Sequence, residues 1–151
     1  MAYEQTRDVL ADAEAFHRQI GEYYHQVSGQ SAKQRIKMLL DYLSRHEEQL
    51  ADSLADYEQD ASQAVMDTWF QSKHKMDICA LLKDVRISPE MSVDDVVDVG
   101  LKVDECLIAV FRDLAENAPC EDVRNLFRNL LELEEEEKRR LVKNALRATD
   151  F

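Results

Sequence analysis

Apolar residues recur every three or four positions over four long stretches, which is the spacing of the buried face of an α-helix. The sequence therefore predicts long helices over residues 3–28, 31–58, 92–117 and 119–148. Between the first two, Ser28-Gly29-Gln30-Ser31 offers a glycine suited to a left-handed helix cap and a serine suited to an N-cap. Ser92-Val93-Asp94-Asp95 predicts a capped helix start, with acids at the positive end of the helix dipole. The pattern indicates two helical hairpins.

The stretch 60–88 follows no single period, so we expect one or two shorter helices there, joining the hairpins. Trp69-Phe70 within it could cap the open side of a bundle or form an exposed anchor for a partner subunit. A long connection lets two hairpins pack side by side. We therefore predict an all-α fold, a four-helix bundle in a single domain 1–151, with hairpins 3–58 and 92–148 and a partly helical connector 60–88.

An ionisable side chain interrupts each apolar stripe near its midpoint. The interruptions are His17, Glu47, Asp104, Glu134 and Glu137. Antiparallel packing would bring all of them to a similar height inside the bundle, where unpaired ionised carboxylates are costly to bury. A divalent or trivalent cation would resolve this, and carboxylates with histidine are typical ligands of iron and manganese. Alternatively, His17 pairs with Glu47 and the long Glu stems carry their carboxylates out to water.

The two halves of the chain repeat one another at an offset of 87 residues. The offset superposes His17 on Asp104, Tyr24 on Phe111, and Glu47 on Glu134, together with several leucines. A duplicated hairpin would build a roughly symmetric site between the halves.

Composition excludes several classes of protein. Only three Gly and two Pro in 151 residues disfavour β-rich folds and phosphate-binding glycine loops. The net charge of −12 disfavours nucleic acid and anionic membrane surfaces as partners. No eighteen-residue apolar run is present, and acids near the start disfavour a signal peptide. The three cysteines, Cys79, Cys106 and Cys120, are widely spaced. Their spacing and the start of the chain together favour a cytoplasmic protein with reduced thiols.

Three other histidines fit no nucleophile or zinc spacing. We interpret His25, His46 and His74 as surface or packing residues. The run 132–140, which begins with acids and ends with bases, is interpreted as a solvated helix face.

The hairpins resemble the ferritin-like superfamily, and within it rubrerythrin-type domains. The nearest likeness is SPEMSVDDVVDVGLKVDECLIAVFRDLAENAPCEDVRNLFRNLLELEEEEKRRL, from Ser88 to Leu141, which is similar to that family's second half. Family members carry a metal-binding Glu on the first helix of each hairpin, with an aromatic residue seven positions on, and Glu-x-x-His on the second helix. Tyr24 and Phe111 match the aromatic positions.

The resemblance implies a metal site made of His17, Glu47, Asp104, Glu134 and Glu137, with departures from the family pattern. His17 and Asp104 stand at the first-helix Glu positions. The paired motifs read Glu47-x-x-Leu50 and Glu134-x-x-Glu137, so both family histidines are replaced, and Leu50 cannot bind metal. Glu14 or His46 could substitute, although both lie beside the stripes.

Two functions remain open at this point. The resemblance implies a metal-dependent oxidase or peroxidase with one or two iron or manganese ions, acting on oxygen, peroxide or ferrous iron, with Tyr24 as a nearby phenol. The alternative is a ferritin-like scaffold with a decayed metal site that serves as a structural or protein-binding module, a homodimer formed across the connector.

Overall fold

Four long helices make up most of the protein. The computed structural model describes residues 2–72 and 86–148. The elements are β1 (Ala2–Gln5), α1 (Thr6–Gln30), α2 (Gln34–Asp60), α3 (Gln63–Met66), β2 (Trp69–Ser72), α5 (Val93–Glu116) and α6 (Glu121–Ala148). The predicted helix bounds are thus confirmed to within a few residues. Cys79 and His74 lie outside the described residues.

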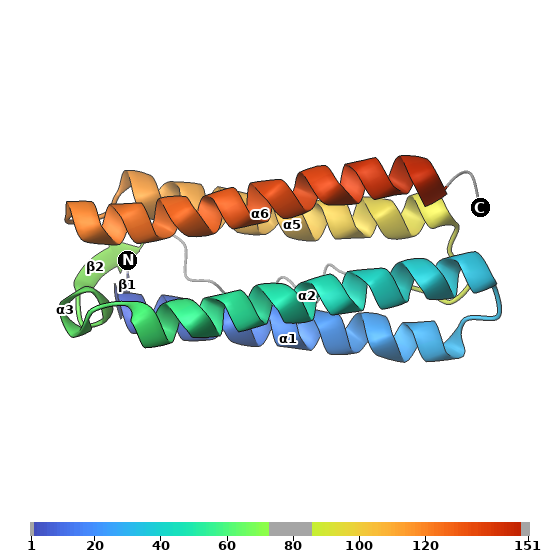
Figure 1. Cartoon of the computed structure of the whole chain (residues 1–151), viewed down its shortest axis with the longest axis horizontal. Coiled ribbons are helices and arrows are strands. Elements are labelled where there is room, and N and C mark those ends of the chain that lie inside the picture. Colours follow the sequence, from blue (N-terminus) through green and yellow to red (C-terminus); the bar gives the residue numbers. More distant parts are fainter. Residues whose placement is uncertain (1, 73–85, 149–151) are drawn as a thin grey trace.

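The long helices form two antiparallel hairpins that lie along one common axis (Figure 1). Helix α1 packs mainly on α2 and α5 on α6, while α2 also contacts both helices of the second hairpin. The predicted all-α four-helix bundle is confirmed. Among the described helices, none combines the length and the apolar character that a membrane span requires.

The helix boundaries show where local sequence signals were sufficient. Ser92 accepts a hydrogen bond from the Asp95 N–H at 3.1 Å, and Asp95 Oδ2 accepts one from the Ser92 N–H at 3.3 Å, which confirms the predicted cap. The prediction for Gly29 is wrong: α1 continues through Gly29 to Gln30, and no described glycine has a positive φ. The predicted N-cap Ser31 instead follows α1 in extended conformation, and Lys33 precedes α2.

A short antiparallel strand pair was not predicted. Residues 3–5 were predicted to belong to the first helix, but residues 2–5 pair as β1 with β2 of the connector, and Glu4 lies opposite Phe70. The chain also returns to the start of α1, where the Thr6 N–H donates to the Thr68 carbonyl at 3.1 Å. This pairing depends on contacts between segments more than sixty residues apart, so no local helical period could indicate it.

The two aromatic residues of β2 take different roles. Phe70 is buried and meets Phe127 of α6 edge-on, with ring centroids 5.8 Å apart. Trp69, on the opposite face of the strand, is 59% exposed. Phe70 therefore packs on the bundle, as the first of the two interpretations expected. Trp69 is exposed, and its role as an anchor for a partner remains a prediction.

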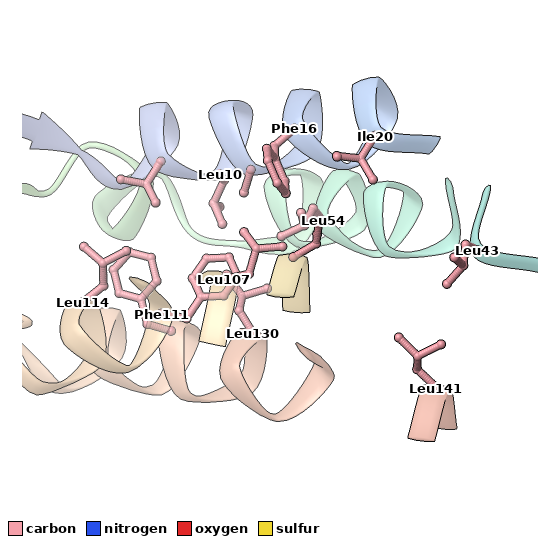
Figure 2. Close-up of a cluster of buried hydrophobic side chains, with 14 of the residues drawn as sticks. Leu10, Phe16, Ile20, Leu43, Leu54, Leu107, Phe111, Leu114, Leu130 and Leu141 are labelled. Carbon is pink, nitrogen blue, oxygen red and sulfur yellow. The ribbon is translucent and has the colours of Figure 1, made fainter. Parts of the chain in front are cut away.

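Between the hairpins lies a continuous apolar core. Figure 2 shows Leu10 and Phe16 of α1 pointing toward Leu107 and Phe111 of α5, while Leu43 and Leu141 face each other further along the bundle. These side chains are at most 4% exposed. Burial of an aliphatic or aromatic side chain of this size contributes roughly 1.5–3 kcal/mol to folding, so this core holds the four helices in the register that aligns their polar positions.

Candidate metal centre

All five predicted site residues lie inside the bundle. His17 comes from α1, Glu47 from α2, Asp104 from α5, and Glu134 and Glu137 from α6. Their exposed fractions run from 0% for His17 to 6% for Glu137. They are buried because each occupies a position on the apolar face of its helix, and that face must pack inward. The alternative in which the Glu carboxylates reach water is therefore wrong.

His17 is the central residue of the cluster. Its Nδ1 lies 2.5 Å from Oε2 of Glu47, and its Nε2 lies 2.7 Å from Oε1 of Glu134. One imidazole thus contacts Glu47 within its own hairpin and Glu134 of the other hairpin. The pairing of His17 with Glu47 that the sequence left open is confirmed, and Glu134 is an additional partner.

The two contacts keep His17 protonated. Burial by itself lowers the pKa of an imidazole, but the charges and hydrogen bonds of Glu134 and Glu47 outweigh it and raise the pKa of His17 to about 10. Both nitrogens therefore donate, and His17 supplies one positive charge to a group of buried acids.

Asp104 has no such partner within the described part of the chain. Burial, followed by the negative charges of Glu47, Glu134 and Glu137, raises the pKa of Asp104 to about 9. Its Oδ2 and the Oε2 of Glu134 are buried and have no hydrogen-bond partner among the described residues. The cluster thus carries more carboxylate than His17 can neutralise, and buried carboxylate oxygens without a partner are costly.

Glu137 connects the cluster to a residue that sequence reasoning treated as surface or packing. Its Oε2 accepts a hydrogen bond from Nδ1 of His46 at 2.9 Å. His46 does pack, with its ring against that of Tyr42, and it also contacts the cluster, which is nearer to the alternative that brought it to the site as a substitute. The signal was its position next to Glu47, on the side of α2 that faces α6.

The Tyr24 hydroxyl is a further buried group without a hydrogen-bond partner among the residues described. Burial, then the negative charges of Glu47 and Asp104, raise the pKa of Tyr24 well above its ordinary value. The phenol is therefore a neutral hydrogen-bond donor that interacts electrostatically with both acids.

The other candidates lie elsewhere. Glu14 accepts hydrogen bonds from Arg18 on the surface of α1 and is not part of the cluster. His25 is exposed, as expected. Leu50 is buried in the apolar part of α2.

No family model matches the sequence, and no curated protein matches it. The fold is similar to that of a solved structure, a proposed ferritin-like diiron-carboxylate protein from Thermotoga maritima. The TM-score is 0.62, the identity is 16%, and the match covers 95% of each chain. This chain has the ferritin-like fold. At 16% identity the likeness concerns the fold, and the rubrerythrin-type assignment remains a prediction.

The buried His, Asp and Glu side chains of this ferritin-like bundle can be compared with the set of ligands that a cation needs. In the described part of the chain, no three His, Cys, Asp or Glu side chains are already arranged to hold a metal. The reason is His17, which lies on Glu47 and Glu134 and uses one oxygen of each. The second oxygen of Glu134 and Oδ2 of Asp104 have no partner in residues 2–72 and 86–148. The donor set therefore fits a cation that needs oxygen ligands, provided that the side chains around it adjust.

Proposed function

We propose that the cluster at the middle of the bundle binds a divalent metal ion, iron or manganese. The observation that carries the proposal is a pair of buried carboxylate oxygens, Asp104 Oδ2 and Glu134 Oε2, which come from neighbouring helices and have no partner among the residues that the structure describes. Glu137 is the third oxygen ligand in this proposal, Glu47 completes the group, and His17, whose two nitrogens both donate, holds Glu47 and Glu134 in place.

The charges of the cluster favour one divalent ion. Four buried carboxylates face the single positive charge of His17, and Asp104 relieves the excess by holding a proton, as its pKa of about 9 indicates. A divalent cation would replace that proton and supply the charge that His17 does not. Ligands that are mainly carboxylates, with imidazole beside them, suit iron and manganese better than the thiolate-preferring metals.

When bound, such an ion would supply redox chemistry toward oxygen or peroxide, so the proposed activity is that of a metal-dependent oxidase or peroxidase. The neighbour from Thermotoga maritima is described as a diiron-carboxylate protein, which supports iron. Loss of the Glu-x-x-His histidine to Leu50, and the two contacts of His17, favour a single ion in this chain.

The residues of this chain would prepare the site in three ways. His17 donates to Glu47 and Glu134 and so fixes the orientation of both carboxylates. The Tyr24 hydroxyl holds its proton and has a free donor inside the bundle. Apolar neighbours such as Phe16, whose ring meets His17 edge-on at 5.9 Å, exclude water and strengthen these charge interactions.

Metal analysis of purified protein tests the proposal. Protein from cells grown with added iron or manganese should retain about half an equivalent of metal or more per chain. The double variant Asp104→Asn with Glu134→Gln should lose it. Glu136→Gln is the matched control, because Glu136 lies on the same helix but is half exposed and pairs with Arg140. Wild-type protein without metal, or a double variant that keeps it, would refute the proposal.

One observation favours a second function, a scaffold whose metal site has decayed. His17 already bridges Glu47 and Glu134, so the cluster is partly balanced without a metal. In that case the protein would act as a structural or protein-binding module, a homodimer through the exposed Trp69. The metal analysis separates the two functions, since a scaffold would contain no metal in any variant. Light scattering of Trp69→Ser would then show whether the dimer forms there.

A further inference from the structure

Helices α2 and α6 meet along a line of polar side chains that leads from the cluster to the surface. Two contacts define it: His46 with Glu137, and Tyr42 with Asn144, where the Asn144 amide donates to the Tyr42 hydroxyl at 2.5 Å. We call these four residues the α2–α6 seam.

Exposure increases from the centre of the cluster to the seam. The side chains of His17 and Glu134 are 0% and 3% exposed, that of Glu137 is 8% exposed, and that of His46 is 19% exposed. Among the described residues, His46 is a partly exposed side chain that hydrogen-bonds directly to a member of the cluster. A cation that reaches the carboxylates must leave water somewhere, and this gradient indicates where.

The His46 ring is held in a defined position. Nδ1 faces Glu137, and the ring lies against that of Tyr42 with centroids 4.1 Å apart. Nε2 has no hydrogen-bond partner among the residues described here. Neutral imidazole is a common metal ligand through either nitrogen. Nε2 of His46 is therefore an atom to which a cation arriving from water can bind.

We infer that His46 is the residue through which a cation passes from water to the buried carboxylates, with Glu137 as the next ligand inward. This inference rests on the proposed function. In this role His46 belongs to the path and not to the final site: it lowers the barrier in both directions and leaves the equilibrium affinity unchanged.

That property distinguishes uptake from a merely structural role. A residue that only orients Glu137 would, when replaced, weaken binding mainly through faster dissociation. A residue that only blocks the seam would, when replaced, speed up association. Loss of a residue on the path slows association and dissociation by the same factor.

The test uses the whole chain, freed of metal, with Co²⁺ as the probe. Equilibrium titration followed by the visible absorbance of Co²⁺ gives the affinity, and stopped-flow mixing gives the rate of association. A chelator chase gives the rate of dissociation. The variant His46→Gln keeps an amide donor for Glu137 but has no imidazole, and His46→Asn is a second variant with a shorter side chain. His25→Gln, at an exposed histidine of α1, is the matched control.

For His46→Gln we expect association and dissociation both to slow by about tenfold, which corresponds to a barrier raised by about 1.4 kcal/mol, with an unchanged dissociation constant. His46→Asn should behave alike and His25→Gln should match wild type. Unchanged rates, faster association, or a weaker affinity caused by dissociation alone would each overturn the role of His46 while metal binding itself stands. A wild-type protein that does not bind Co²⁺ would overturn this inference and the proposed function together.

Discussion

Replacing Asp104 with Asn should stabilise the metal-free protein, and the gain should increase with pH. Asparagine has the same shape as aspartate but no charge, and position 104 is 2% exposed. The side chain lies among three other acids, and its pKa is raised from 3.8 to about 9.

The magnitude follows from proton linkage. An acid whose pKa is raised by folding contributes its full stability below its ordinary pKa of 3.8, and loses it as the pH rises toward the folded value of about 9. At neutral pH the folded protein keeps a proton that the unfolded chain releases. Each pH unit between the ordinary pKa and neutral pH lowers the free energy of unfolding of the wild type by about 1.4 kcal/mol. Over about three units the loss reaches about 4 kcal/mol. The buried amide of Asn carries a cost of its own, so we expect a net gain of about 2 kcal/mol.

Urea unfolding of metal-free protein, followed by circular dichroism, measures the effect. The free energy of unfolding of Asp104→Asn should be only slightly higher than that of wild type at about pH 5. At about pH 8 it should be clearly higher. Asp98→Asn is the control, because Asp98 is an exposed residue of the same helix. Equal gains at both pH values, or a loss of stability at the higher one, would refute the reasoning about the buried charge.

Three further predictions concern the same fold. The variant His17→Gln should lose about 3–5 kcal/mol of stability near neutral pH, since it leaves Glu47 and Glu134 without their shared cation. It should also lack the wild-type decline in stability as the pH rises from 6.5 toward 10, the ordinary and raised pKa values of His17, in urea titrations across that range. Phe111→Ala should lower the free energy of unfolding by about 3–5 kcal/mol, because Phe111 is fully buried. Val142→Ala, at an exposed position of α6, should lower it little. A small loss at Phe111 would mean that the core is not packed as Figure 2 shows. Ser92→Ala should cost about 1 kcal/mol, since it removes the side-chain acceptor for the Asp95 N–H, and a thermal melt that matches wild type would contradict that role.

The periodic positions of the chain were sufficient to predict the four long helices and their pairing as hairpins. They were also sufficient to place His17, Glu47, Asp104, Glu134 and Glu137 on inward faces, because an amphipathic helix buries its apolar stripe together with any polar residue that lies on it. Local capping chemistry likewise predicted the start of α5 at Ser92.

The arrangement within the cluster was decided only by the tertiary structure. A helical period states which residues face inward, but not which oxygen meets which nitrogen across four helices. That His17 contacts both Glu47 and Glu134, that Oδ2 of Asp104 has no partner among the described residues, and that His46 reaches Glu137 depend on the rotation and the relative height of neighbouring helices. The pairing of β1 with β2 had the same origin. Its hydrogen bonds join segments far apart in sequence, and such contacts become favourable only when the bundle has already brought the segments together.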